Sequence, residues 1–426
     1  MQMTISPGSP AAAVITAPPS KSMAHRAVLC AGLARGISNI HNLSYSQDIK
    51  ATLAGVAQAM AKVQCGPTGA RIEGRGGFAT LVKPVYCGES GSTLRFFIPV
   101  FSLTGQQVQF TGAGRLFDRP MGVYQDIFDS QRIRFTQTAQ DITIKGAVSP
   151  GEFTIPGNVS SQFISGLLFA LPTLYKDSVI HITPPFESRS YVELTLGVME
   201  DFGVRATWSE EEPDTLVIPG GQRYHNRDYT VEGDYSQAAF FAVLGAVRGG
   251  VELTGLRPDS RQGDAAILDI LERCGAAITR EKDSIRLQAS ELTATEIDLA
   301  DCPDLGPILM VLGCFCRGTT RIKNAGRLRL KESDRIAAME EELRKFGARI
   351  SSTENEVTIE GGPLSIPGLL HGHNDHRVVM SLAVCALCAG YRVTIEDAQA
   401  VNKSWPDFFT VLEKTGAEIK ETENAG

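Results

Sequence analysis

The apolar residues of this chain gather into six helix-like stretches, each of which follows a short polar opening. Successive openings are 69 to 74 residues apart and begin at Ser20, Ser90, Ser160, Asp234, Pro303 and Asn374. Apolar runs of this length predict buried helices. A recurrence at so regular a spacing predicts six copies of one structural unit, because such a unit needs neighbours to complete its core.

The residues after each predicted helix repeat a second pattern. A break at Gly or a polar residue leads into a β-rich run, such as 107–113 or 392–398, and then into a second helix pattern, such as 332–348. Four of the six second helices end on Gly, which is typical of a helix C-terminus. Pairs of strands follow. The sequence therefore predicts a strand–helix–strand–helix–strand–strand unit six times, in two domains of three, since 426 residues exceed what one core serves.

The composition excludes several classes of protein. No apolar run reaches the roughly 18 residues of a membrane helix, and no basic residue precedes Lys21, so neither a membrane span nor a signal peptide is expected. Nine cysteines, an odd number, lie mostly in apolar stretches and indicate reduced thiols in the cytoplasm. The net charge of −7 disfavours nucleic acid as a partner.

Two clusters have the residue types of a metal site. Cys385 and Cys388 form C-x-x-C inside an apolar helix pattern, and no second Cys or His pair is placed to complete four ligands, so core packing is favoured. His371, His373 and His376 straddle a turn before a helix, where a role in an anion site is favoured over a metal. We therefore expect no metal.

Cations recur at two equivalent positions of the repeat, which surface charges have no reason to do. Helix starts expose free backbone N–H groups and the positive end of the helix dipole, so they can hold anions. Lys21, Arg26, Arg95 and Arg377 lie at these starts. Others precede the second helices: Arg119, Arg189, Arg261, Arg327, Lys331, Arg335 and Lys403. The opening at Asp234 has an acid and no Lys or Arg, so a structural or hinge-like role is expected there.

Polar donors and two acids accompany these cations. The hydroxyl and amide residues at the helix starts, such as Ser20 and Thr93, can cap a helix and contact an anion with the same geometry. The glycines of GESGST at 88–93 let a ligand approach the backbone, although no Lys follows as in a Walker A loop. Asp304 and Glu332 lie among cations, where ion pairing and proton transfer both stay open.

These segments together resemble the 5-enolpyruvylshikimate-3-phosphate synthase (3-phosphoshikimate 1-carboxyvinyltransferase) family. The similarity runs from Pro19 to about Phe409 and rests on the ordered motifs SKSMAHRA, GxSGSTLR, DRPM, NVSSQF, EGDYSQAAFF, PDL, LKESDR, NDHR and NKSWPDFF. It implies an α/β (α+β) fold of two domains, each with three βαβαββ repeats around a pseudo-threefold axis, an inverse α/β barrel. Residues 20–231 would form an inserted domain and 1–19 with 232–426 the other, with crossings near 18–20 and 231–234 and the active site in the interdomain cleft.

The resemblance also implies the reaction. The enolpyruvyl group of phosphoenolpyruvate would pass to the 5-hydroxyl of shikimate 3-phosphate by addition and elimination, releasing phosphate without a cofactor, in aromatic amino acid biosynthesis. Asp304 is the candidate base, and Lys21 and Glu332 compete as the acid. Phosphoenolpyruvate would be bound by Lys21, Gly91, Arg119, Gln162, Arg335, Arg377 and Lys403. Shikimate 3-phosphate would be bound by Ser22, Arg26, Ser160, Ser161, Gln162, Ser188, Asp304 and Lys331.

Two positions depart from the family pattern, and two alternative functions remain. Glu89 stands where Asn is usual, and Arg327 where Asn is frequent. A UDP-N-acetylglucosamine enolpyruvyl transferase would carry a Cys in the loop that here reads GAGRLFDRPM, and a Lys-Asn pair where this chain has Lys21-Ser22. A non-catalytic anion-binding paralogue would be expected to lack Lys21, Asp304 or Glu332. We expect a monomer whose partners are the two small substrates.

Overall fold

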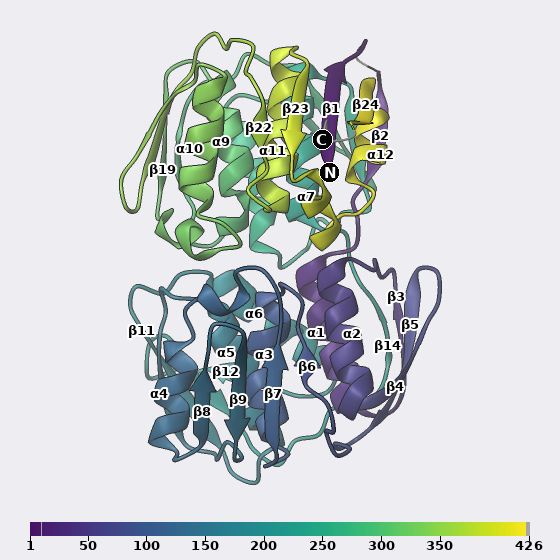
Figure 1. The fold of residues 1–426 in the computed structure, drawn as a ribbon, viewed down its shortest axis with the longest axis vertical. Helices are drawn as coiled ribbons and strands as arrows, with labels where there is room; N and C mark the ends of the chain where they lie inside the picture. Colours follow the sequence, from purple (N-terminus) through teal and green to yellow (C-terminus); the bar gives the residue numbers. More distant parts are fainter. Residues whose placement is uncertain (10, 423–426) are drawn as a thin grey trace. The chain divides into compact units, whose positions relative to one another are not determined.

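The chain forms two compact units in the computed structural model, which describes residues 1–9 and 11–422 (Figure 1). One unit comprises Met1–Ser20 and Glu232–Gly426, and the other comprises Lys21–Val231. The described residues form six four-stranded sheets, three in each unit. The repeat predicted from the sequence is confirmed, because all six sheets share one topology.

The unit Lys21–Val231 holds three of these sheets. Their strands, in spatial order, are β14 (Asp228–Thr230), β3 (Arg35–His41), β5 (Gly69–Arg75) and β4 (Ala61–Cys65); β6 (Val85–Tyr86), β7 (Gln107–Thr111), β9 (Asp141–Lys145) and β8 (Arg134–Gln137); and β10 (Glu152–Pro156), β11 (Ser178–Thr183), β13 (Thr215–Ile218) and β12 (Thr207–Trp208).

The other unit holds the remaining three sheets. Their strands are β2 (Ala13–Thr16), β15 (Val251–Thr254), β17 (Ser284–Gln288) and β16 (Ala277–Arg280); β18 (Glu296–Asp298), β19 (Thr319–Lys323), β21 (Val357–Glu360) and β20 (Arg349–Ser352); and β22 (Leu370–His371), β23 (Val393–Glu396), β1 (Gln2–Pro7) and β24 (Ala417–Thr422).

Each sheet pairs its first two strands in parallel and the rest antiparallel. Parallel neighbours need a crossover. In four sheets the first helix of the repeat supplies it, whereas β2 and β15 are joined through the unit Lys21–Val231, and β3 and β14 are separated by the rest of that unit. In β10 and β11, Phe153 lies opposite Ile180 and Ile155 opposite Ile182, so alternate side chains on both strands face the core.

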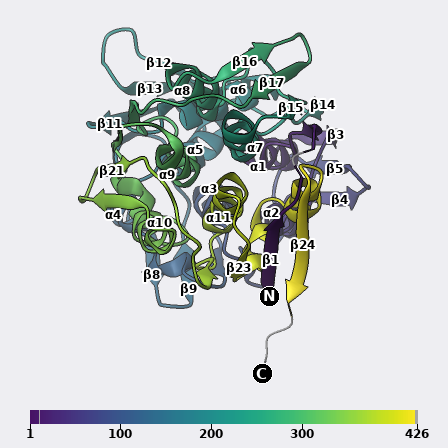
Figure 2. The ribbon, with the colours of Figure 1, turned by 90° about the horizontal axis from the view of Figure 1, so that it is seen from above.

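The first helices of the repeats carry most of the buried apolar surface. They are α1 (Lys21–Leu33), α3 (Gly91–Ser102), α5 (Ser161–Ala170), α7 (Tyr235–Arg248), α9 (Gly306–Phe315) and α11 (His376–Ala389). In the unit that contains both termini, α7, α9 and α11 pack against one another, and strands lie around them (Figure 2). Among the described residues, no helix has the length and apolarity to cross a bilayer.

The second helices are shorter on average than the first. They are α2 (Gln47–Ala59), α4 (Gly122–Ser130), α6 (Arg189–Asp201), α8 (Ala266–Arg273), α10 (Arg335–Lys345) and α12 (Phe408–Glu413). Short 3-10 helices precede four of them: η1 (Leu116–Asp118), η3 (Gly263–Ala265), η5 (Gly326–Leu330) and η6 (Ala398–Lys403). Two more flank first helices, since η2 (Leu171–Thr173) follows α5 and η4 (Pro303–Leu305) precedes α9.

Two of the six predicted helix starts are shifted along the chain. The fifth opening folds into the 3-10 helix η4, and α9 begins only at Gly306. The sixth helix begins at His376, and its N-cap is Asp375 rather than Asn374. Ser90, Ser160 and Asp234 cap α3, α5 and α7 as side-chain acceptors, as the sequence predicts for such residues.

Candidate active site

Lys21 is the first residue of α1, and a carboxylate on the neighbouring helix fixes its side chain. Its Nζ lies 2.8 Å from Oδ2 of Asp48, which stands in the first turn of α2. Ser46 caps that helix and so sets the position of Asp48. The Lys21 side chain is 17% exposed. The ammonium is thus held at a helix start and can still reach a ligand.

Arg26, one turn further along α1, is buried and contacts only uncharged groups in its hydrogen bonds. Nε donates to Oγ1 of Thr195 at 2.8 Å, and the two terminal nitrogens donate to the carbonyls of Ser22 at 2.7 Å and Tyr191 at 3.0 Å. The guanidinium also lies 5.2 Å from the ring centre of Phe96. Burial lowers the pKa of Arg26 to about 10. An anionic ligand would stabilise this buried charge.

The start of α3 brings together three residues that the sequence assigns to phosphoenolpyruvate. A Cβ added at Gly91 would lie 2.6 Å from Nη1 of Arg119 and 3.5 Å from Oε1 of Gln162. Nη1 of Arg95 donates to that same Oε1 at 2.8 Å, and Nε2 of Gln162 donates to Oγ of Ser92 at 2.8 Å. A larger residue at this position would therefore displace the end of the Arg119 side chain.

Arg95 is a residue whose role the sequence did not reveal. It lies one turn into α3, and Nη2 donates to the carbonyl of Pro120, next to Arg119, at 3.0 Å. It therefore contacts both Gln162 and the loop that carries Arg119. Its position in the second opening was the available signal, but nothing in the sequence distinguishes a cation that orients ligand residues from one that binds the ligand.

The predicted serines lie at two more helix starts of the same unit. Ser160 caps α5, with its Oγ accepting from the backbone N–H of Gln162, and Ser161 begins the helix. Ser188 is buried at the N-cap position of α6 with a left-handed backbone, φ 56°. The hydroxyls of Ser165 and Thr195 join α5 to α6 at 2.7 Å. These serines therefore belong to one packed group of helices with Arg26.

Asp304, in the unit that contains both termini, lies among three cations. Its Oδ1 is 3.2 Å from both Nζ of Lys331 and Nη1 of Arg335, and its Oδ2 is 3.1 Å from Nη2 of Arg377. Burial favours the neutral acid, but Arg377, Lys331 and Arg335 outweigh it and hold the pKa of Asp304 well below its usual range. The carboxylate is therefore ionised in this arrangement.

Lys331 lies in the same cluster, and its neighbours shift its pKa in opposite directions. Burial lowers its pKa, Asp304 raises it, and the neighbouring Arg335 and Arg327 lower it further. Arg327 is itself buried on η5. The residue that departs from the family pattern thus adds positive charge beside Lys331.

Arg335 joins Glu332 to Asp375. Its Nη2 lies 2.7 Å from Oε2 of Glu332, and its Nε lies 2.8 Å from Oδ2 of Asp375. Burial lowers the pKa of Arg335, but Asp375, Glu332 and Asp304 raise it further, so the guanidinium stays charged. Asp375 was missed in the sequence, although an acid directly before a helix is the usual signal for an N-cap.

Lys403 and the histidines lie around the start of α11. Nζ of Lys403, on η6, donates to the carbonyl of Asn374 at 2.6 Å. His371 and His373, which the sequence favours for an anion site, each contact a carboxylate in this structure. Nδ1 of His371 lies 2.6 Å from Oε2 of Glu396, and Nε2 of His373 lies 3.1 Å from Oε1 of Glu342.

One group of residues has the donor types of a metal site. The ligand atoms of Glu341, Glu342 and His373 lie within 4.8 Å of one another. However, Nζ of Lys345 lies 2.8 and 2.9 Å from the two oxygens of Glu342. An ammonium therefore already neutralises this carboxylate, and the group fits an ion-pair cluster better than a cation site.

Glu89, the other departure from the family pattern, lies against the loop that leads to Arg119. A Cβ added at Gly114 would lie 2.5 Å from Oε2 of Glu89, and Gly114 itself has a positive φ of 58°. The carboxylate therefore packs on a loop position that only glycine fills without strain.

The comparisons with known proteins give one consistent family. The family model described as EPSP synthase (3-phosphoshikimate 1-carboxyvinyltransferase) matches residues 5–412. The 3-phosphoshikimate 1-carboxyvinyltransferase of Clostridium novyi (strain NT) is 42% identical over 418 residues, which cover 96% of each chain. The enzyme of the same name from Clostridium kluyveri is 41% identical over 95% of each chain.

Two solved structures share the fold. EPSP synthase from Acinetobacter baumannii superposes with a TM-score of 0.82 at 24% identity, covering 99% of this chain and 100% of that one. The enolpyruvyl transferase NikO from Streptomyces tendae gives a TM-score of 0.78 at 17% identity, covering 99% and 98%. The fold class expected from the sequence is confirmed.

Proposed function

Because this chain belongs to the EPSP synthase (3-phosphoshikimate 1-carboxyvinyltransferase) family, we propose that it transfers the enolpyruvyl group of phosphoenolpyruvate to the 5-hydroxyl of shikimate 3-phosphate. The observation that carries this proposal is the placement of Asp304 among Lys331, Arg335 and Arg377. A carboxylate surrounded by cations suits a reaction between two anions in which a hydroxyl must lose its proton.

The phosphoenolpyruvate residues are proposed to come from both units. Lys21, Gly91, Arg119 and Gln162 supply one part, and the geometry around Gly91 supports it by leaving space beside the Arg119 guanidinium. The other part is Arg335, Arg377 and Lys403. Guanidinium groups suit this ligand because their planar donors match carboxylate and phosphate oxygens.

The shikimate 3-phosphate residues are proposed to divide in the same way. Hydroxyl and amide donors of Ser22, Ser160, Ser161, Gln162 and Ser188 would bind together with the cation Arg26. The uncharged hydrogen-bond partners of Arg26 support this role, since the phosphate would supply its counter-charge. Asp304 and Lys331 complete the set.

The chemistry needs a base, an acid and a stabilised leaving group. In the addition, the oxygen of the 5-hydroxyl group bonds to C2 of phosphoenolpyruvate while Asp304 takes the proton of that hydroxyl. An acid protonates the C3 methylene in the same step. In the elimination, C3 loses a proton and the C2–O bond to phosphate breaks, with both electrons leaving on phosphate. The low pKa of Asp304 makes it a weak base, but anionic substrates would neutralise its three cations and raise that pKa.

Two residues remain as alternatives for the acid. Lys21 carries an ammonium held by Asp48, and Glu332 carries a carboxyl group held by Arg335. An ammonium carries a proton that it can donate, whereas a carboxyl group that contacts a guanidinium is placed to accept hydrogen bonds from it. This contact supports Lys21 as the acid.

The test is phosphate release from phosphoenolpyruvate with each acceptor. We expect release with shikimate 3-phosphate and none with UDP-N-acetylglucosamine. Release only with the UDP-sugar would favour the sister enolpyruvyl transferase, and release with neither would favour a non-catalytic paralogue. Relatives that are about 40% identical over nearly the whole chain are named 3-phosphoshikimate 1-carboxyvinyltransferase, which supports release with shikimate 3-phosphate.

We further propose that the protein acts as a monomer in the cytoplasm. Its nine cysteines are free thiols, and seven of them are buried, which suits a reducing compartment. Light scattering coupled to size-exclusion chromatography tests the monomer, with a mass of 45.9 kDa expected and twice that mass contradicting it.

A further inference from the structure

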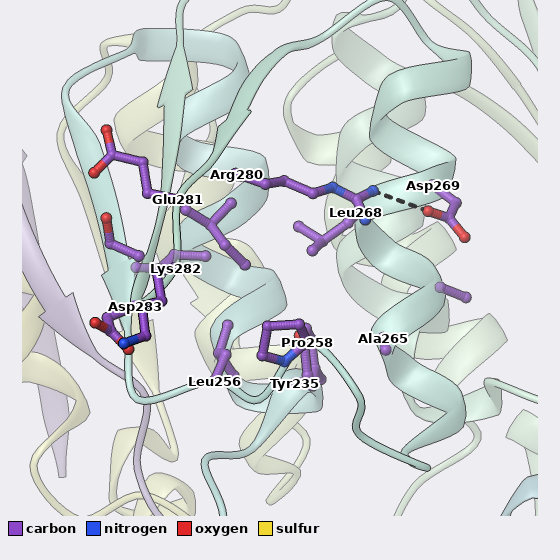
Figure 3. Close-up of a pocket in the computed structure, with 14 residues that line it drawn as sticks. Tyr235, Leu256, Pro258, Ala265, Leu268, Asp269, Arg280, Glu281, Lys282 and Asp283 are labelled. Carbon is purple, nitrogen blue, oxygen red and sulfur yellow. Dashed lines mark hydrogen bonds and ion pairs between the residues drawn. The ribbon is translucent and has the colours of Figure 1, made fainter.

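A cavity of about 300 Å³ lies in the unit that contains both termini, and neither Asp304 nor its three cations line it (Figure 3). Its walls come from α8, the hairpin of β16 and β17, and the loop after β15. None of the residues assigned above to either substrate lines it. This volume is at the small end of the range for ligand pockets, so it suits a small molecule.

The inner walls of the cavity are apolar. Leu253, Leu268 and Ile285 are buried around it, and Leu256 and Pro258 complete the wall near the loop. Figure 3 shows Leu268 projecting from α8 and Leu256 and Pro258 lying together at the opposite end. An apolar group placed here would lose water contact on several sides, which favours binding.

Three of the five charged residues at the rim are already paired. Arg280 extends from the hairpin to α8, where its Nη2 lies 3.0 Å from Oδ1 of Asp269 and 3.0 Å from Oε2 of Glu272 (Figure 3). Oε1 of Glu281 lies 3.0 Å from Nη1 of Arg286. These charges are therefore neutralised within the protein.

Lys282 and Asp283, at the tip of the hairpin, are the other two. Both side chains are exposed, and neither forms a hydrogen bond or ion pair with any residue of the described ranges 1–9 and 11–422. One unpaired cation and one unpaired anion thus stand side by side at the rim of an apolar cavity. This arrangement complements a small zwitterion that carries an apolar group.

We propose that this cavity binds a free α-amino acid with an apolar side chain. The side chain occupies the space between Leu253, Leu268 and Ile285, the carboxylate pairs with Lys282, and the ammonium pairs with Asp283. A phosphorylated compound fits less well, because Lys282 is the one unpaired cation among the described residues that line the cavity, and Asp283 beside it would repel a dianion. A hydrocarbon would fill the space but leave the two charges unused.

Isothermal titration calorimetry of the full chain with L-phenylalanine tests the site. We expect saturable binding of one molecule per chain. Three compounds each remove one feature of the ligand: N-acetyl-L-phenylalanine lacks the ammonium, L-phenylalaninamide lacks the carboxylate, and glycine lacks the side chain. The first two should each bind about fivefold more weakly, which is the change expected for losing one partly exposed ion pair. Glycine should bind more than about fivefold more weakly, because it loses the burial of an apolar side chain. Equal binding of all four compounds would overturn the proposal.

Two substitutions locate the binding. Lys282→Gln should weaken L-phenylalanine about fivefold and leave phosphate release without amino acid unchanged, whereas Lys62→Gln, an exposed lysine on β4, should change neither. Ala265→Leu, which fills the cavity from η3, should abolish binding while the melting curve shows a folded protein. No saturable heat with the unmodified chain, or full affinity in both cavity variants, would show that the amino acid does not bind here.

Discussion

Nε of Arg335 lies 2.8 Å from Oδ2 of Asp375, and the two side chains form an ion pair that solvent cannot reach. The Arg335 side chain is 1% exposed and the Asp375 side chain is 0% exposed. The same carboxylate accepts from the hydroxyl of Ser333 at 3.1 Å and from the backbone N–H of Arg377 at 2.9 Å. Asp375 therefore caps α11 and fixes two arginines of the proposed phosphoenolpyruvate site at once.

Asp375→Asn should impair both stability and catalysis. The amide keeps the cap but removes the charge, which leaves Arg335 buried with only Glu332 and Asp304. Breaking a buried pair costs about 3–5 kcal/mol. A displaced guanidinium should also lower kcat/KM for phosphoenolpyruvate about 100-fold. Thermal melting and phosphate-release kinetics measure the two effects.

Asp334→Asn provides the matched control for that substitution. Asp334 caps α10 and pairs with Arg329 at 3.0 Å, but both side chains are partly exposed. Loss of this pair should cost about 1 kcal/mol or less and leave kcat/KM within about twofold. An effect as large as that of Asp375→Asn would mean that any lost helix cap in this region disturbs the site.

Lys21→Met should lower kcat by about 100-fold to 10,000-fold if Lys21 protonates the methylene carbon. Asp48→Asn keeps the ammonium but loses its 2.8 Å contact, so a smaller loss of about tenfold is expected. Exchange of the methylene protons of phosphoenolpyruvate with D2O, in the presence of shikimate 3-phosphate, reports the protonation step itself.

If Glu332 is the acid instead of Lys21, the same exchange experiment should show the larger loss in the Glu332 variant. If Glu332 donates the proton, Glu332→Gln abolishes exchange and Lys21→Met mainly raises KM. Lys50→Met, an exposed lysine on α2, controls for the loss of a positive charge near Asp48 and should leave exchange unchanged.

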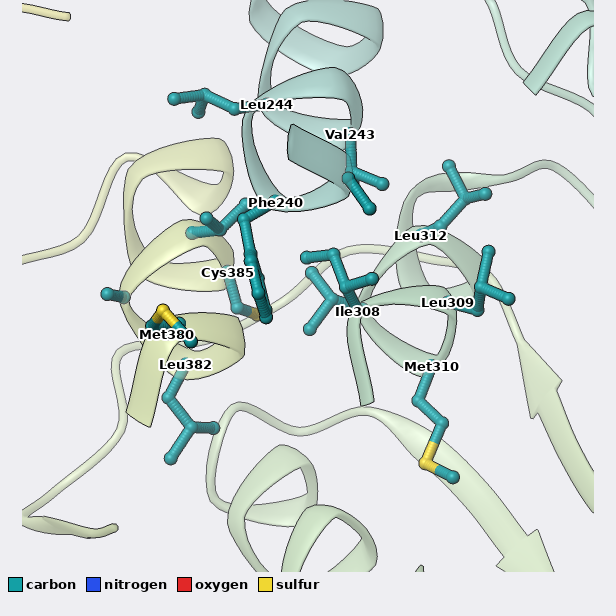
Figure 4. Packing of buried hydrophobic residues seen from close by; sticks show 14 of the residues in the cluster. Phe240, Val243, Leu244, Ile308, Leu309, Met310, Leu312, Met380, Leu382 and Cys385 are labelled. Atoms are coloured by element: carbon teal, nitrogen blue, oxygen red, sulfur yellow. The ribbon is translucent and has the colours of Figure 1, made fainter. Parts of the chain in front are cut away.

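The six repeats and their buried first helices could be predicted from the hydrophobic pattern, because a buried helix needs a long apolar run in the sequence. Phe240 on α7, Ile308 on α9 and Cys385 on α11 lie in one core cluster (Figure 4), and the apolar surroundings of Cys385 had already favoured packing over a metal site. The helix starts were less predictable, since a 3-10 turn at Pro303 or a cap at Asp375 depends on single backbone angles.

The candidate site followed from the sequence only in part. Lys21, Asp304 and Arg335 could be singled out by charge and motif. Asp48 lies outside the motifs, and Asp375 lies in NDHR but had no role assigned, because both act through contacts made by folding. His371 and His373 resemble site residues in the sequence, yet Glu396 and Glu342 contact them in the fold. Ion pairs between residues far apart in the sequence depend on distances in the folded protein, and a local sequence pattern does not predict these distances.

Arg95→Met should raise KM for phosphoenolpyruvate more than it lowers kcat. The substitution keeps an unbranched apolar stem but removes the donors to Gln162 and to the carbonyl of Pro120, so Gln162 and the Arg119 loop lose their orientation. A rise of about tenfold in KM is expected for the loss of a charged hydrogen bond. Arg134→Met on β8, at an exposed position, should leave both constants unchanged, and an unaltered KM in Arg95→Met would remove this orienting role.

His373 gives the protein a stability that depends on pH. The hydrogen bond to Glu342 raises the pKa of His373 above its ordinary value of 6.5, although burial opposes the shift. Because the folded state binds the proton more tightly than the unfolded state, this stabilisation is complete below pH 6.5 and is lost as the pH rises through the higher folded pKa. The charged hydrogen bond is partly exposed, so about 1 kcal/mol is expected.

His373→Asn should therefore lower the melting temperature by about 2 °C at pH 6 and by much less at pH 9. Circular dichroism melting curves of both proteins at the two pH values measure this difference. Glu342→Gln removes the partner, so adding His373→Asn to it should cause no loss that depends on pH. If His373→Asn instead lowers the melting temperature equally at both pH values, the imidazole contributes by packing, because a neutral contact would be insensitive to its protonation.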